Sequence, residues 1–81
     1  MVNVRLFGMA RINFDKKAFQ IEAASVKELV QKMAKMTGIP KSDAKQYLIF
    51  VNEINIDKLK RFRTKLNDGD EVLFLSPSSG G

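Results

Sequence analysis

The sequence contains no cysteine and no histidine. These absences exclude disulfides, thiolate nucleophiles and the usual zinc sites, and they remove the side chain most often used for acid–base chemistry near neutral pH. Asp68, Asp70 and Glu71 are a group of acids that would suit a cation, but three acids in a tight turn more often fix the geometry of the turn. We therefore expect no metal site. Carboxylates, lysines, hydroxyl groups and the chain ends remain for chemistry.

Long hydrophobic runs are also absent. No stretch of about 18 apolar residues occurs, so no membrane-spanning helix is expected. The first residues, Met1 to Arg5, lack the basic and then apolar blocks of a signal peptide, and we expect a cytoplasmic protein. A chain of 81 residues with 44% hydrophobic residues can form one modest core but has little room for a deep cleft. This counts against an enzyme that acts alone.

Several segments alternate between apolar and polar residues, as strands with one buried face do. In residues 2–7, Val2, Val4 and Leu6 are the apolar members of the first such segment. The other expected strands are residues 17–22, 47–51, the short segment 54–56, and 71–75. Between the first two strands we expect a turn region with Ile12 and Phe14 facing inward.

A helix is predicted over residues 25–38. Ser25 and Glu28 have the spacing of a capping box, and Gly38 and Pro40 are typical of a helix end. One apolar stripe lies between them: Val26, Leu29, Val30, Met33 and Ala34. The order of elements predicts an α+β fold with one main helix packed across one face of a mixed sheet of four to five strands. We expect one domain, residues 1–75, and a flexible tail, residues 76–81.

The tail contains the clearest functional signal. Its six residues, Ser76 to Gly81, have small side chains and would reach roughly 20 Å if extended. Gly80 and Gly81 have no Cβ, so this backbone can enter a channel that excludes larger residues. A thin projecting end with a free carboxylate suits a carrier that another enzyme modifies. The alternative is a frayed end without function.

Four segments resemble the MoaD and ThiS carriers, which are the small subunit of molybdopterin synthase and its thiamine-pathway relative. The segments are Val4 to Phe7, Val51-Asn52, Leu66 to Val72 and the terminal Gly80-Gly81. The resemblance covers nearly the whole chain, is closest to the molybdopterin synthase small subunit, and implies the ubiquitin-like β-grasp fold. The chain departs from these carriers at Ser76-Pro77, where synthase small subunits often have two prolines.

The resemblance also implies a function as a sulfur carrier in molybdenum cofactor biosynthesis. In such carriers an ATP-dependent adenylyltransferase of the ubiquitin-activating type adenylates the C-terminal glycine, which then becomes a thiocarboxylate. Gly81 would be the reacting residue and Gly80 the residue that lets the tail thread. The carrier itself would bind no cofactor and catalyse nothing. Its expected partners are the adenylyltransferase and the large subunit of molybdopterin synthase or another sulfur acceptor enzyme.

Other functions stay open within the same class. The chain would serve equally well as a sulfur carrier for thiamine, cysteine or tRNA thiolation, or as a ubiquitin-like modifier joined to lysines. The tail chemistry is the same in each of these cases, so the sequence does not select the pathway.

Apolar residues on the sheet face away from the helix predict a docking surface. By alternation, Leu6, Leu48 and Phe74 are expected to face the helix. The expected partner-binding residues are Phe7, Ile49, Val51, Leu73, Leu75 and Pro77. The strand that contains Ile49 also resembles the ubiquitin strand whose middle isoleucine is an exposed contact residue. The alternatives are that loops cover these residues or that they are scattered without a role.

The net charge of +5 is concentrated in residues 58–65. Five of these eight residues are basic: Lys58, Lys60, Arg61, Arg63 and Lys65. An RNA-binding module, the alternative from another class, would place these charges on phosphates and the Phe62 ring on a base. We favour a solvated edge that resists strand-to-strand aggregation, with electrostatic steering to an acidic partner as a third use.

Overall fold

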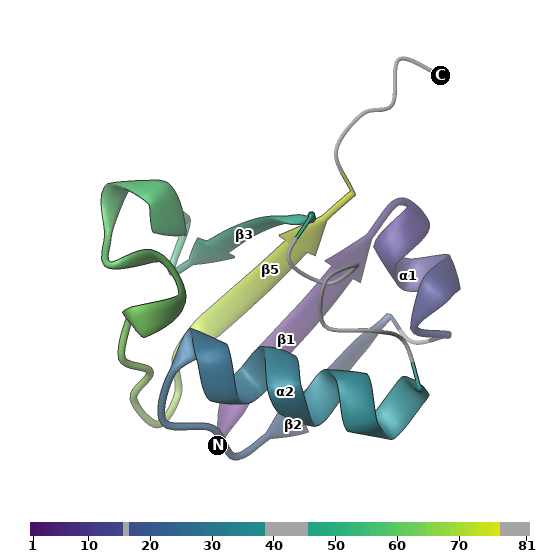
Figure 1. Cartoon of the computed structure of the whole chain (residues 1–81), viewed down its shortest axis with the longest axis horizontal. Helices are drawn as coiled ribbons and strands as arrows, with labels where there is room; N and C mark the ends of the chain where they lie inside the picture. The colour runs from purple at the N-terminus through teal and green to yellow at the C-terminus, as the bar shows by residue number, and fades with distance from the viewer. Residues whose placement is uncertain (16, 39–45, 77–81) are drawn as a thin grey trace.

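The computed structural model describes residues 1–15, 17–38 and 46–76. Over these ranges the chain forms a five-stranded sheet with one long and one short α-helix (Figure 1). The strands are β1 (Val2–Phe7), β2 (Ala18–Ile21), β3 (Leu48–Val51), β4 (Ile54–Asn55) and β5 (Glu71–Leu75). The helices are α1 (Met9–Asn13) and α2 (Val26–Thr37), with the 3-10 helices η1 (Ile56–Lys58) and η2 (Arg61–Arg63) after β4.

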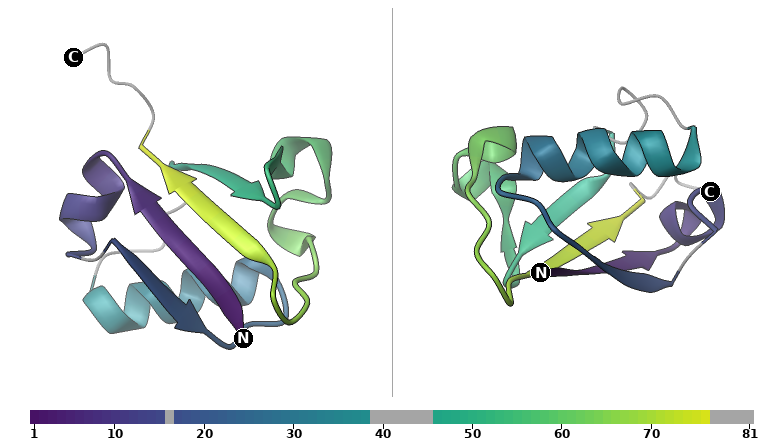
Figure 2. Two further views of the ribbon diagram at one scale, coloured as in Figure 1. Left: turned by 180° about the vertical axis from the view of Figure 1, so that it is seen from behind. Right: turned by 90° about the horizontal axis from the view of Figure 1, so that it is seen from below.

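The strands pair in the order β2-β1-β5-β3-β4. The two central strands, β1 and β5, are parallel, and the other pairs are antiparallel. The helix α2 lies across one face of this sheet (Figure 2, right). A mixed sheet of five strands covered by one main helix confirms the predicted α+β class and the β-grasp arrangement.

The core lies between α2 and the sheet face toward it. The sheet contributes the buried side chains of Val2, Val4, Leu6, Ile49, Val51, Val72 and Phe74. The helix contributes those of Val26, Leu29, Val30 and Met33. Removing one such large apolar side chain from water stabilises the fold by roughly 1.5–3 kcal/mol. These contacts, rather than helix propensity, hold the single long helix on the sheet.

Both ends of α2 are capped as predicted. The Ser25 hydroxyl accepts a hydrogen bond from the Glu28 N–H at 3.1 Å, and the Glu28 carboxylate accepts one from the Ala24 N–H at 2.9 Å. At the other end Gly38 adopts a left-handed conformation with φ 76°, and its N–H donates to the Ala34 carbonyl at 2.8 Å. These bonds satisfy groups that a helix end otherwise leaves unpaired.

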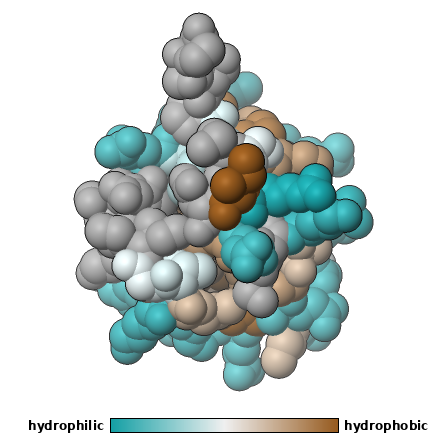
Figure 3. All heavy atoms as spheres, turned by 90° about the vertical axis from the view of Figure 1, so that its right-hand side faces the viewer, coloured by the Kyte–Doolittle hydropathy of each residue, from teal (hydrophilic) through white to brown (hydrophobic). Residues whose placement is uncertain are grey.

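The segment after β1 differs from the prediction, because part of the expected turn region is the helix α1. Phe14 is buried as expected, but Ile12 is 68% exposed, so its inward placement was wrong. Ala10 and Phe14 are four residues apart and share the buried face, which places Ile12 on the opposite side. On the side of the molecule that carries α1, the most strongly hydrophobic surface forms small areas among hydrophilic ones (Figure 3).

Candidate functional site

The end of β5 positions the tail. β5 lies between β1 and β3, so the chain leaves the sheet from its middle. Because β5 runs parallel to β1, it ends at the pole of the sheet opposite Met1 (Figure 1). Pro77, Gly80 and Gly81 lie outside the described residues, and their roles stay predictions.

Ser76 is the last described residue before the tail, and it makes a contact that no sequence pattern indicates. Its hydroxyl oxygen accepts a hydrogen bond from the backbone N–H of Ala10 in α1, at 2.6 Å. The two residues are 66 positions apart in the chain. The start of the tail is therefore tied to the domain at α1.

The sheet face away from α2 presents an apolar patch next to the end of β5. We call this the outer patch; it consists of Phe7, Leu48, Phe50, Leu73 and Leu75. Register places Phe7 and Leu48 on either side of Leu75, and Phe50 beside Leu73, so the five side chains share one face. Phe7 is 44% exposed and Leu48 is 42% exposed, while the other three are half-buried. No described helix covers this face (Figure 2, left).

Two predicted docking residues lie on the wrong face for that role. Ile49 is 1% exposed and Val51 is 5% exposed, and they pair in register with the core residues Phe74 and Val72. The exposed residue next to Ile49 on this strand is Leu48, so the comparison of Ile49 with the exposed ubiquitin isoleucine was also wrong. The run is apolar on both faces, so alternation alone could not decide which residues face the helix.

The same face is polar toward the other pole. Arg5 on β1 borders the outer patch beside Leu73, and Glu71 on β5 lies beyond it. The Asn3 side chain, which pairs with Glu71, accepts a hydrogen bond from Gln20 at 2.8 Å. A hollow of about 350 Å³ lies between the two halves, lined in part by Arg5, Phe7 and Leu73. An apolar centre with a charged border is the usual composition of a protein–protein interface.

The basic segment, residues 58–65, follows the edge strand β4 and reaches the start of α2, where the Thr64 carbonyl accepts a hydrogen bond from the Val26 N–H at 3.0 Å. Its five cationic side chains are exposed, and Arg61 lies 3.4 Å from the Asp57 carboxylate. Phe62, by contrast, packs against the core. Because the ring is turned inward, it is not presented for stacking on a base, which weighs against the RNA-binding alternative. The placement supports the interpretation as a solvated edge.

The acidic turn before β5 has structural contacts. The Asp68 carboxylate pairs with the Met1 amino group. The Asp70 carboxylate accepts hydrogen bonds from the Asn52 side chain at 3.1 Å and the Asn67 N–H at 2.8 Å. Among the described residues, no three His, Cys, Asp or Glu side chains come together as metal ligands. Within these ranges the contacts of Asp68 and Asp70 hold the turn in place.

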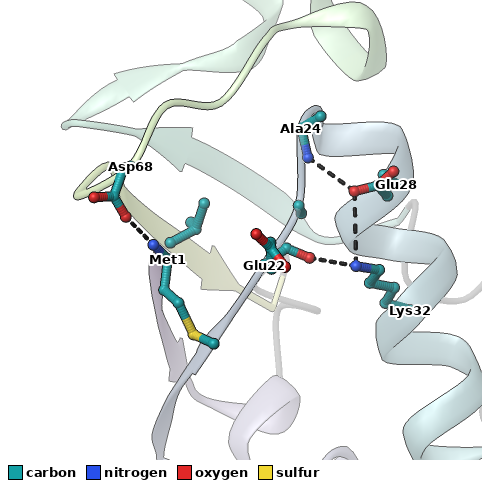
Figure 4. A pocket seen from close by; sticks show the side chains of 8 residues that line it. Met1, Glu22, Ala24, Glu28, Lys32 and Asp68 are labelled. Carbon is teal, nitrogen blue, oxygen red and sulfur yellow. Dashed lines mark hydrogen bonds and ion pairs between the residues drawn. The ribbon is translucent and has the colours of Figure 1, made fainter.

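A hollow of about 490 Å³ lies at the Met1 pole (Figure 4). Its polar groups already contact one another within the wall: Met1 with Asp68, Ala24 with Glu28, and Lys32 with the Glu22 carbonyl. It opens far from the end of β5, at the opposite pole of the sheet. We therefore do not assign it to the tail chemistry.

Neither α1 nor α2 has the length and apolar character of a membrane-spanning helix, and the described ranges contain no other candidate.

Comparison with solved structures places this fold among ubiquitin-like proteins. Subunits 1 and 2 of the molybdopterin-converting factor of Helicobacter pylori 26695 form a complex that contains a chain 32% identical to this one, with a TM-score of 0.71 and coverage of 99% and 97% of the two chains. The small archaeal modifier protein 1 of Methanosarcina acetivorans is 26% identical, with a TM-score of 0.83 and coverage of 99% and 95%.

A third similarity supports the fold alone, because its sequence identity is low. The BexX/CysO complex of Amycolatopsis orientalis contains a chain 18% identical, with a TM-score of 0.85 and full coverage of both chains. No curated protein matches the sequence. The sequence matches the ThiS family over residues 4–81, a range that includes the terminal Gly-Gly. This match covers nearly the entire chain, and the chain therefore belongs to the ThiS family of ubiquitin-like sulfur carriers.

Proposed function

We propose that this protein carries sulfur on Gly81 as the small subunit of a molybdopterin synthase. The observation that carries the proposal is the family match, which continues through the tail to residue 81. The 32% identical chain from Helicobacter pylori, in a complex of the two subunits of a molybdopterin-converting factor, supports this pathway over the others.

The proposed chemistry needs no side chain of the carrier. The Gly81 carboxylate attacks the α-phosphorus of ATP, and pyrophosphate leaves as the acyl adenylate forms. Hydrosulfide then attacks the activated carbonyl, AMP leaves, one proton is released and a thiocarboxylate remains. The adenylyltransferase supplies the groups that stabilise the developing charge, and the carrier supplies position. A chain without cysteine or histidine is adequate for this role.

The outer patch is the proposed docking surface for both partners. It adjoins the end of β5, so a partner seated on it lies next to the point where the tail begins. Phe7, Leu73 and Leu75 keep their predicted role, and Leu48 and Phe50 take the places of Ile49 and Val51. The domain would dock by the patch while the tail reaches the reacting centre.

Intact mass spectrometry tests the proposal. The protein is incubated with ATP, its adenylyltransferase and sulfide, and we expect a mass gain equal to the difference between sulfur and oxygen. A variant lacking Gly81 is the control and should gain nothing. An unmodified wild-type protein, with an adenylyltransferase that remains active on another carrier, would refute the proposal.

Pathway is tested with the acceptor enzymes. The thiocarboxylate form should form a complex with the large subunit of molybdopterin synthase and transfer its sulfur to the precursor held there. Transfer only with a thiazole-forming, cysteine-forming or tRNA-thiolating enzyme would keep the carrier function and replace the pathway.

A role as a protein modifier is the second candidate, because one similar structure is a small archaeal modifier protein. It predicts that the activated Gly81 carbonyl is attacked by a lysine amine, giving an isopeptide bond and releasing AMP. Digestion of cell protein with trypsin, followed by a search for lysines that carry the tail remnant, distinguishes the two functions.

A further inference from the structure

The hydrogen bond between Ser76 and α1 has the geometry of a helix cap supplied from outside the helix. α1 starts after Gly8, which has no side chain to accept a bond from the first N–H groups. The N–H of Ala10, the second helical residue, donates instead to the Ser76 hydroxyl at 2.6 Å. Such groups at a helix start need an acceptor, and an oxygen at the second or third N–H is the usual one.

The backbone conformation of Gly8 sets the path of the chain from β1 into α1. Its backbone has φ 63° and ψ −140°, a combination that is nearly restricted to glycine. A Cβ on Gly8 would lie at an ordinary contact distance, 3.5 Å, from the Ser76 hydroxyl oxygen, so glycine is needed here for its backbone conformation rather than for space. The turn at Gly8 therefore brings α1 beside the ends of β1 and β5 and presents the Ala10 N–H to Ser76 (Figure 1).

The position of Ser76 along the chain gives this bond a functional consequence. Ser76 follows β5 directly and precedes the reacting Gly81 by five residues. An extended chain of that length spans roughly 17 Å, so a modest rotation at its first residue moves its end by several Å. A bond that restricts this rotation narrows the volume that the terminal carboxylate explores.

We propose that Ser76 is a positioning residue, which fixes the direction in which the tail leaves the domain by capping α1. The inference rests on the proposed function, because direction matters only if the tail must reach a reacting centre on a docked partner. It assigns α1 a role as the anchor of the tail. Misdirection of a reacting group by small distances lowers rates strongly.

The experiment compares three variants of the full-length protein. Ser76→Ala removes the hydroxyl, and Ser76→Thr keeps one. Ser25→Ala is the matched control, because it removes the cap of α2 at the other pole of the sheet. Adenylation is measured as pyrophosphate release with the partner adenylyltransferase, and docking is measured separately as the Kd of the complex without ATP.

For Ser76→Ala we expect kcat to fall roughly threefold to tenfold, because fewer docked molecules have the tail in place. The docking Kd should be unchanged, Ser76→Thr should restore kcat, and Ser25→Ala should leave kcat at the wild-type value. An equal fall of kcat in Ser25→Ala would show that the loss of either helix cap has this effect, so that Ser76 has a structural role only. A rise in Kd with unchanged kcat would place Ser76 in the docking surface. Either result would overturn the inference.

Amide hydrogen exchange tests the bond without reference to the proposed function. The Ala10 amide should exchange faster in Ser76→Ala than in the wild-type protein and in Ser25→Ala. An unchanged exchange rate would overturn the inference. If the wild-type protein is not adenylated at all, the proposed function fails, and faster exchange would still establish the bond. If it is adenylated and Ser76→Ala has the same kcat, only the positioning role fails.

Discussion

At the scale of single residues, neighbouring side chains on β3 have opposite environments. Leu48 is 42% exposed in the outer patch, and Ile49 is 1% exposed in the core. The two residues are similar in size and adjacent in sequence, so substitutions at them separate docking from stability. The pair therefore tests the corrected assignment of the face directly.

We predict that Leu48→Ala weakens partner binding and lowers the free energy of unfolding by less than about 1 kcal/mol. Ile49→Ala should lower it by roughly 2–5 kcal/mol, because it leaves a cavity against Phe74. Urea unfolding and titration calorimetry with the partner enzyme measure the two effects. Unimpaired binding by Leu48→Ala would count against the outer patch.

Gly80 gives a second prediction at this scale. A Gly80→Val variant should not be adenylated, because a branched side chain does not fit a channel shaped for glycine. Its unfolding transition should match the wild type, since the described core lies between residues 2 and 74. Mass spectrometry and thermal unfolding measure both properties, with Ser78→Ala as the control. Normal adenylation of Gly80→Val would show that the site tolerates bulk there.

At the scale of elements, the two α-helices differ in how they are specified. α2 has its caps and its apolar stripe within its own sequence, between Ser25 and Gly38. α1 has five residues, takes its cap from Ser76, and follows a glycine whose conformation the sequence does not reveal. A short helix that depends on a distant segment has no local pattern by which to predict it.

The caps of α2 provide a prediction for the element. Ser25→Ala should lower the free energy of unfolding by about 1 kcal/mol, because the Glu28 N–H loses its acceptor. Gly38→Ala should cost about 1–2 kcal/mol, because alanine is strained at φ 76°. Urea unfolding with unchanged m-values measures both. A neutral Gly38→Ala would mean that the helix end rearranges without cost.

At the scale of the whole molecule, the functional features are separated in space. The tail begins at one pole, the outer patch adjoins it, and the polar hollow of Figure 4 lies at the other pole. The basic segment follows the edge strand β4 and contributes much of the net charge of +5. Such a charge affects how fast a partner is found more than how tightly it is held.

We predict that the double variant Lys60→Gln, Arg63→Gln associates with an acidic partner enzyme several-fold more slowly at low salt and dissociates at the wild-type rate. Stopped-flow measurements at two ionic strengths provide the rates. RNA binding should be weak in both proteins. Tight, salt-dependent RNA binding that the double variant loses would instead support the RNA-binding alternative.

The sequence by itself determined the order of the strands, the limits of α2 and the family. These features are encoded locally: alternation in β1, a capping box at Ser25, an apolar stripe, and short segments that resemble known carriers. It also placed Phe7, Leu73 and Leu75 on the outer face correctly. On their strands the alternate residues are clear core residues, so alternation places these three on the opposite side.

Only the tertiary structure decided the orientation of β3 and the role of Ser76. The run from Leu48 to Val51 is apolar on both faces, so its orientation depends on its register with β5. The bond from Ala10 to Ser76 joins residues 66 positions apart through a turn at Gly8. Both features follow from pairing between distant segments, and the periodicity of one segment carries no information about its distant partner.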